Sequence, residues 1–195
     1  MERELILTGI GGQGVQLAAQ VLARAATLEG RAVMLFGVYS GMMRGGNSDS
    51  TLVVADGAVE APPLISSSWS AIVMHDMFWL PLSGKLRVGG VAVINSSLFE
   101  GELDHARYRV FDVPATDLAT ELGLPMAASM VIAGAYAAVT GLVGVESLVE
   151  GMRQSLPPYR QQHAAGNERA IRAGFDAAEQ GGSGLAAPAW EAVPA

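Results

Sequence analysis

The chain has 195 residues, 50% of them hydrophobic and 16% charged, which is enough for one domain with a sizeable core. Its formal net charge is −7, it has no run of Lys or Arg, and Lys85 is its only lysine. Nucleic acid requires a concentrated cationic surface, so no nucleic-acid partner is expected. The absence of cysteine excludes disulfides, thiolate nucleophiles and cysteine-ligated iron–sulfur clusters from this chain.

The charged fraction is low, since about a quarter of residues is usual. This favours a chain partly buried against a partner, although a compact Ala/Gly-rich monomer has the same composition. The N-terminus, MERELILTG, lacks the apolar core of an export signal, so a cytoplasmic location is expected.

The first elements predict a strand–helix–strand unit. Leu5–Thr8 is a short apolar run, and Val15–Leu28 places apolar residues on one helical face. Gly30 ends the helix, and Val33–Phe36 forms a second strand. The two strands are expected to be parallel, as in a βαβ unit.

The rest of the chain alternates strands and helices before becoming helical. Gly37–Ser50 predicts an irregular loop rich in Gly, Ser and Asn. Further strands are expected at Thr51–Val54, Ala71–Met74, Val91–Ile94 and Tyr108–Val113, and helices at Ala115–Leu122, Ala127–Thr140, Val145–Ser155 and Glu168–Glu179. The predicted class is therefore α/β: a Rossmann-like three-layer domain with a mostly parallel sheet and a helix-rich C-terminal third.

Two segments test this organisation. Met126–Val145 has no charge and is long enough to span a bilayer, but its Ala/Gly content and lack of basic flanks favour a helix buried in the core. Residues 1–180 are expected to form one domain. Residues 181–195, GGSGLAAPAWEAVPA, are expected to form a flexible or docking tail.

The stretch GIGGQG contains a G-x-G-x-x-G motif formed by Gly9, Gly11 and Gly14. In dinucleotide-binding folds such glycines allow a tight turn, close ligand approach and close helix packing, and the helix N-terminus faces a phosphate. The alternative is that they only permit tight packing.

A dinucleotide site also needs an acidic residue at the end of the second strand. None follows VMLF: Glu29 and Arg31 precede that strand, and Arg44 lies well beyond it. A free NAD(P) site, or a nucleotide-binding regulatory module, is therefore an alternative function that lacks part of its expected motif.

Arg44, Gly45 and Gly46 place a permanent cation beside two residues that let the backbone bend sharply. This arrangement suits a phosphate, a carboxylate or an acidic surface on a partner. The alternative is a local ion pair between Arg44 and Asp49 or Asp56. No metal-ligand spacing occurs among the three histidines, and no catalytic residue is predicted. His75 and Asp76 follow the Ala71–Met74 strand, at the edge where open α/β sheets carry ligands, but the favoured interpretation is that Asp76 caps a short helix.

The combination of GIGGQGV, MRGG, TLVVAD, the segment from Pro125 to Met152 and the N-x-x-A-x-x-x-G of Asn167, Ala170 and Gly174 resembles one family. It is the gamma subunit, or gamma domain, of the 2-oxoacid:ferredoxin (acceptor) oxidoreductases. The resemblance runs from Leu5 to Asp176. GMMRGGNSDS departs from some relatives, which carry Pro or Gln before the Arg.

The resemblance implies a subunit of a complex that uses thiamine diphosphate, Mg²⁺ and iron–sulfur clusters and usually transfers an acyl group to coenzyme A. Alpha, beta and delta subunits would hold those cofactors and pass electrons to an acceptor such as ferredoxin. This chain would hold no cofactor alone, and its contact residues toward coenzyme A or a neighbouring chain are predicted as a set: Gly9, Gly11, Gly12, Gln13, Gly14, Arg44, Gly45 and Gly46.

Overall fold

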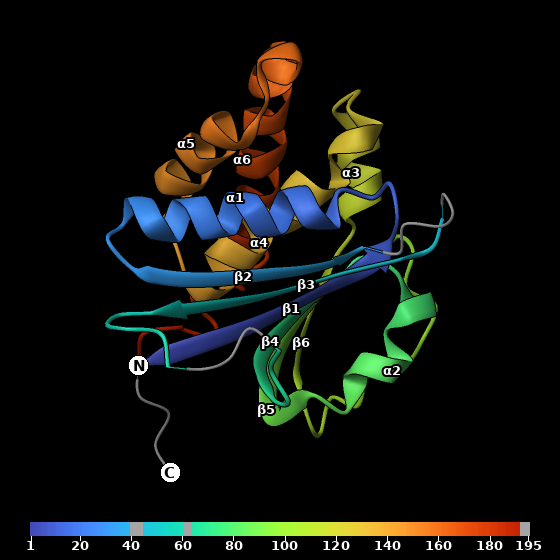
Figure 1. The fold of residues 1–195 in the computed structure, drawn as a ribbon. Helices are drawn as coiled ribbons and strands as arrows, with labels where there is room; N and C mark the ends of the chain where they lie inside the picture. The colour runs from blue at the N-terminus through green and yellow to red at the C-terminus, as the bar shows by residue number, and fades with distance from the viewer. Residues whose placement is uncertain (40–44, 61–63, 192–195) are drawn as a thin grey trace.

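The computed structural model describes residues 1–39, 45–60 and 64–191, and it contains one six-stranded sheet in the order β2-β3-β1-β4-β5-β6 (Figure 1). The strands are β1 (Glu2–Ile10), β2 (Ala32–Tyr39), β3 (Asn47–Ala55), β4 (Ser68–Val73), β5 (Leu86–Asn95) and β6 (Arg109–Val113). The α-helices are α1 (Val15–Leu28), α2 (Leu80–Ser83), α3 (Ala115–Glu121), α4 (Ala128–Thr140), α5 (Val145–Ser155) and α6 (Ala164–Gln180). Short 3₁₀ helices are η1 (Asp76–Phe78), η2 (Pro125–Ala127) and η3 (Pro158–His163). The α/β prediction is confirmed.

Only β3 runs against the other strands. β1, β4, β5 and β6 pair in parallel, whereas β3 pairs antiparallel with both β1 and β2. β1 and β2 therefore run in the same direction, as predicted, but β3 lies between them. The predicted loop Gly37–Ser50 is wrong at both ends, because β2 continues to Tyr39 and β3 begins at Asn47 to form a hairpin with it.

The two faces of the sheet are covered unequally. The main core lies between one face and helices α1, α3, α4, α5 and α6, while the opposite face carries α2, η1 and connecting segments (Figure 1). Successive strand residues point to opposite faces, so Ile72 joins the main core whereas Ala71 and Val73 join the smaller one.

Helix α4 is buried along its whole length: all 13 of its residues are buried. Gly134 lies against the carbonyl of Ile171, and Gly174 lies against the carbonyl of Val131, so α4 and α6 cross at backbone contact. A methyl group at either glycine would overlap the facing carbonyl. The predicted core helix is thus confirmed, and within the described part of the chain no helix has the length and apolarity needed to cross a membrane.

The segment after α6 closes the C-terminal end of α4. Its backbone N–H groups at Leu185, Ala187 and Ala189 donate to the carbonyls of Ala138 (2.7 Å), Val139 (3.0 Å) and Thr140 (2.7 Å). The Trp190 indole N–H donates to the Leu142 carbonyl (3.2 Å). The last carbonyls of an α-helix have no partner within the helix, so this segment satisfies groups that would otherwise be buried unpaired.

Two arginines hold the same segment. The Arg3 guanidinium donates to the carbonyls of Ala189 and Glu191, and Arg31 stacks on the Trp190 ring with 3.5 Å between its Cζ atom and the ring centroid. Residues up to Glu191 of the predicted tail therefore pack on their own domain, and residues 192–195 lie outside the described part of the chain.

We expect a chain truncated after Gly182 to be less stable than the full chain by several kcal/mol, because each buried carbonyl left unpaired costs about 1–3 kcal/mol. Urea unfolding followed by circular dichroism measures this. The control is a chain ending at Glu191, which keeps all of these contacts. Equal stability of the two truncated chains would contradict this role for the segment.

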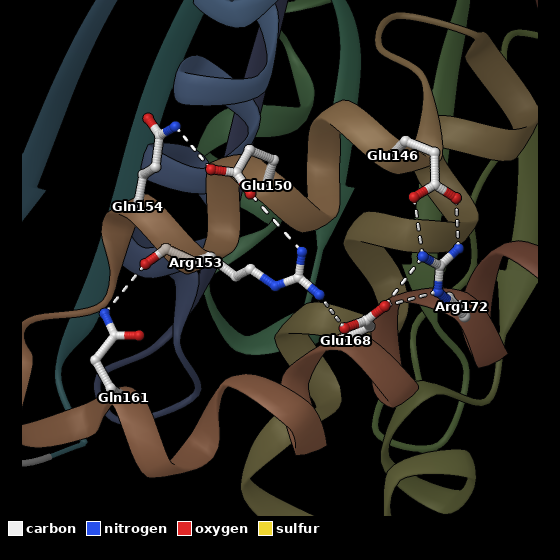
Figure 2. Close-up of polar contacts among 7 residues, drawn as sticks. All are labelled: Glu146, Glu150, Arg153, Gln154, Gln161, Glu168 and Arg172. Atoms are coloured by element: carbon white, nitrogen blue, oxygen red, sulfur yellow. Dashed lines mark hydrogen bonds and ion pairs between the residues drawn. The ribbon is translucent and has the colours of Figure 1, made fainter.

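Helices α5 and α6 are joined by an ion-pair network (Figure 2). Arg172 donates to both carboxylate oxygens of Glu146 (2.7 and 2.9 Å) and to Glu168 (3.0 Å). Arg153 donates to Glu168 (2.6 Å) and lies 3.7 Å from Glu150. Hydrogen bonds from Arg172 hold the pKa of Glu146 and of Glu168 below the ordinary glutamate value.

We expect Arg172→Gln to lower the unfolding temperature near neutral pH, and the difference from wild type to shrink as the solution is acidified. A carboxyl group whose pKa is depressed by folding stabilises the folded state above its unfolded pKa, about 4.3, and loses that contribution as pH falls through the folded value. Calorimetry at several pH values, with exposed Arg24→Gln as control, tests this; a difference that grows on acidification would refute it.

Candidate functional site

The glycine turn joins β1 to α1 at the carboxyl end of the sheet's central strands. Gly9 lies near the end of β1, and Gly14 is the N-cap residue of α1, with φ of 83° and no side-chain cap. Gln13 ties the turn together: its Oε1 accepts the Ile10 N–H (2.8 Å), and its own N–H donates to the Ile10 carbonyl (3.0 Å). The first N–H groups of α1 have no partner within the helix, and no acidic side chain lies in its first turn.

Gly9 and Gly14 have packing roles. A methyl group at Gly9 would lie 2.8 Å from Cβ of Met74, at the end of β4, and one at Gly14 would overlap the hydroxyl of Ser129 in α4. These two glycines thus match the packing explanation considered from the sequence. They let α1 approach β4 and α4 closely.

Gly12 and Gly45 differ, because a methyl group at either would meet no atom of the described residues within 4 Å. Their φ values, 106° and 90°, explain why glycine occupies both positions. Between them the Gly11 N–H donates to the Gly46 carbonyl (2.7 Å), which joins the glycine turn to the segment that leads into β3. The two predicted motifs therefore come together, although Arg44 lies outside the described residues.

A polar network under this junction was not predicted from the sequence. Asp49 accepts hydrogen bonds from the Thr8 hydroxyl (2.7 Å) and the Asn47 amide (2.6 Å). Gln16 donates to the Asp49 carbonyl (2.7 Å) and accepts from the Ser50 hydroxyl (2.9 Å). The register Thr8↔Asp49 and Ile10↔Asn47 between β1 and β3 aligns these residues, and sequence reasoning missed them because it treated 47–50 as loop.

One atom of this network has no partner within the part of the chain that the structure describes. The Asn47 NH₂ group must face the Asp49 carboxylate, because a carboxylate only accepts, and this fixes the Asn47 Oδ1 in the other direction. That oxygen is buried, and no residue in 1–39, 45–60 or 64–191 offers it a hydrogen bond. Buried polar atoms normally have one, so a donor from a bound group or water fits at this position.

The residues considered for an NAD(P) site have other roles. Glu29 is at the opposite end of α1, about 21 Å along a 14-residue helix from the glycine turn, and accepts the Gly144 N–H (2.7 Å). Arg31 stacks on Trp190. Neither residue can reach a ribose held at the glycine turn.

The end of β4 lies beside the glycine turn, where the Met74 N–H donates to the Thr8 carbonyl (2.9 Å). The prediction that Asp76 caps the following helix is wrong. His75 is the N-cap residue of η1, and its Nδ1 accepts the Met77 N–H (3.2 Å), because His75 is the residue with extended backbone before the first turn.

The two carboxylates considered as ion-pair partners of Arg44 have other contacts. Asp49 accepts hydrogen bonds from Thr8 and Asn47, and Asp56 pairs with the N-terminal amine, which lowers the pKa of Asp56.

A cavity of about 510 Å³ lies between β5, β6 and the connection that joins them. Its lining includes Phe99, Glu102, His105 and Asp112 and no residue of the glycine turn. Across the described residues, no three His, Asp or Glu side chains gather to hold a metal ion.

Residues 4–177 match the family model described as pyruvate ferredoxin/flavodoxin oxidoreductase. The chain belongs to this family. The match runs from β1 into α6, so it includes the glycine turn and the segment joined to it. The resemblance inferred from the motifs is confirmed.

Relatives match along nearly their full length. The 2-oxoglutarate synthase subunit KorC of Methanothermobacter marburgensis is 30% identical over 188 residues, which cover 93% of this chain and 99% of that protein. The gamma subunit of keto/oxoacid ferredoxin oxidoreductase from Geobacter sulfurreducens superposes with a TM-score of 0.75 and 25% identity, over 91% of this chain and 99% of the other.

A longer chain shares the fold. It belongs to 2-oxoglutarate:ferredoxin oxidoreductase from Magnetococcus marinus, whose structure contains 2-oxoglutarate, coenzyme A and succinyl-CoA. The TM-score is 0.80 at 16% identity, over 92% of this chain and 31% of the other. At that identity the likeness concerns the fold alone.

We expect Gly14→Ala to destabilise the chain more than Gly12→Ala. Both place a methyl group on a backbone with positive φ, at about 1–2 kcal/mol, but only the first also overlaps Ser129, at about 1–3 kcal/mol more. Urea unfolding measures both variants. Adding Ser129→Ala to Gly14→Ala should recover part of the loss, and strict additivity of those two changes would contradict the proposed contact.

Proposed function

We propose that this chain is the gamma subunit of a thiamine diphosphate-dependent 2-oxoacid:acceptor oxidoreductase complex. The complex oxidatively decarboxylates a 2-oxoacid and transfers the acyl group to coenzyme A, and the chain contributes assembly and contact surfaces. The observation that carries this is the junction of the glycine turn with Gly46, in a chain that matches oxidoreductase subunits along nearly their full length.

The proposed ligand contact is with the phosphates of coenzyme A. Backbone N–H groups at the N-terminus of a helix bind anions, and at α1 neither an acidic side chain nor a capping side chain competes for them. Gly12 and Gly45 have no side chain of their own and open space around them among the described residues, and the sequence places the Arg44 cation next to Gly45. Coenzyme A would supply the thiol that accepts the acyl group. This chain would only hold and orient its phosphate end.

The remaining cofactors belong to the proposed partners. The chain has no cysteine for iron–sulfur clusters, and its only Asp-Gly pair with a neighbouring small residue, at Asp56-Gly57, does not form a thiamine diphosphate motif. Alpha, beta and delta subunits would hold thiamine diphosphate, Mg²⁺ and the clusters, and would deliver electrons to ferredoxin or a similar acceptor. The isolated chain is then inactive.

In the assembled complex, Arg44→Ala should raise the KM for coenzyme A about tenfold or more, because a charge-assisted phosphate contact contributes about 1.5–3 kcal/mol. The KM for the oxoacid should stay unchanged. Arg24→Ala, at an exposed position of α1, is the control that removes an arginine elsewhere. Unchanged kinetics and unchanged assembly in Arg44→Ala would eliminate the proposed role of this residue.

Three measurements, one on the co-expressed complex and two on the isolated chain, separate this proposal from the nucleotide-binding alternatives. Native mass spectrometry of the chain co-expressed with its partners should find it in a heteromer, and the chain alone should show no oxidoreductase turnover. Calorimetric titration with NAD⁺ and NADP⁺ should show no binding. Tight dinucleotide binding by the isolated chain would favour a Rossmann-type dehydrogenase or a regulatory module instead.

A further inference from the structure

The sheet has two edge strands, and they differ in chemistry. β2 has eight residues, AVMLFGVY, with no charge and no proline. β6 has five residues and carries Arg109 and Asp112. Natural sheets protect their edges with charges, prolines, bulges or short strands, because an edge presents unpaired N–H and C=O groups to any other strand. β6 uses charge and shortness, whereas β2 uses none of these devices.

The side chains of β2 are also incompletely covered. Leu35 is 38% exposed and Phe36 is 37% exposed, on opposite faces of the sheet. Among the described residues no strand lies beyond β2 in the sheet. The inner strands contrast with it, since all six residues of β4 are buried.

The chemistry of the edge limits what can cover it. About half of the residues in an antiparallel edge strand direct their N–H and C=O groups away from the sheet. Water bonds these groups while the edge is exposed, but under a protein partner only another extended backbone satisfies them in series. A helix packed there would leave them unpaired. The occupant is therefore a strand, and the uncharged sequence of β2 calls for an uncharged one.

We propose that β2 pairs antiparallel with β2 of a second copy of this chain, so that one continuous sheet runs through a symmetric dimer. The second copy offers an uncharged strand of the same length, and no like charges meet within the paired strands. Pairing β2 with β2 forms a closed dimer, whereas pairing β2 with β6 of the next chain would add one chain after another and form an open fibre. The β2–β6 pair would also place Arg109 and Asp112 opposite apolar residues.

The geometry of such a pair is restricted. Directly opposed residues in an antiparallel pair lie on the same face of the sheet, so a two-fold axis perpendicular to the sheet passes midway between one residue and the same residue of the second copy. Near the centre of β2 that residue is Leu35 or Phe36. The α1 helices of both copies then lie on the same side of the joined sheet, because α1 covers the face to which Leu35 belongs.

Sedimentation equilibrium of the full chain, without coenzyme A or partner subunits, tests the dimer. The wild-type chain should be dimeric at about 100 µM, and Phe36→Lys should weaken self-association about tenfold or more by bringing two like charges together near the axis. Val88→Lys, at an exposed position of β5 inside the sheet, is the matched control and should remain dimeric. A monomeric wild-type chain, or a Phe36→Lys chain that dimerises as wild type does, would overturn the proposal.

The absence of cysteine permits a second test of the register. Leu35→Cys and Phe36→Cys each introduce the only thiol in the chain, and opposed residues of an antiparallel pair lie close enough for a disulfide. One of the two should form a covalent dimer rapidly under mild oxidation, while Val88→Cys should not. If neither links faster than Val88→Cys, β2 does not lie at the axis.

Failure of the dimer and failure of the proposed function give different results. The wild-type chain could be monomeric by itself, while Phe36→Lys removes the subunits that co-purify with it. This pair of results would show that a strand of another subunit pairs with β2. That outcome overturns the self-pairing but leaves the proposed oxidoreductase complex intact.

Discussion

Helix α4 has no residue at the surface, and the rest of the molecule is arranged to meet that condition. A helix buried on every side needs neighbours that approach it closely and partners for the backbone groups at its ends. Gly134 and Gly174 meet the first need by bringing α4 and α6 to backbone contact. The segment from Leu185 to Trp190 meets the second by donating to the carbonyls at the C-terminal end. The one large polar side chain in the middle of α4, Tyr136, bonds the Ser70 hydroxyl (2.8 Å), and burial raises its pKa.

The same helix shapes the candidate site. Ser129, in its first turn, lies where a side chain at Gly14 would project, so the start of α1 is fixed against the start of α4. The glycine turn therefore has two sides with different constraints. Gly9 and Gly14 face the protein and are small for packing, while Gly12 and Gly45 face outward and are glycine because of their backbone conformation. Of these four glycines, the outward pair has open space around it among the described residues.

Several of the charged residues add polar contacts between elements that also share the core. Glu146, Glu168 and Arg172 join α5 to α6 at the surface, and Arg3 and Arg31 hold the C-terminal segment. The β2 edge has no charge at all. The chain thus has ion pairs and polar contacts among its helices and C-terminal segment, and an uncharged edge strand with outward-facing backbone N–H and C=O groups. Both are consistent with membership of a family whose curated relatives are subunits.

The sequence by itself determined the α/β class, the positions of α1 and α5, the burial of α4 and the family, because apolar periodicity, glycine spacing and the absence of cysteine are properties of local sequence. It did not determine that β3 lies between β1 and β2, that Asp49 links Thr8 to Asn47, or that Glu29 and Arg31 serve distant partners. Those outcomes depend on strand order and on which ends of elements meet. Strand order and contacts between distant residues depend on how the whole core packs, so they cannot be predicted from local patterns of residues.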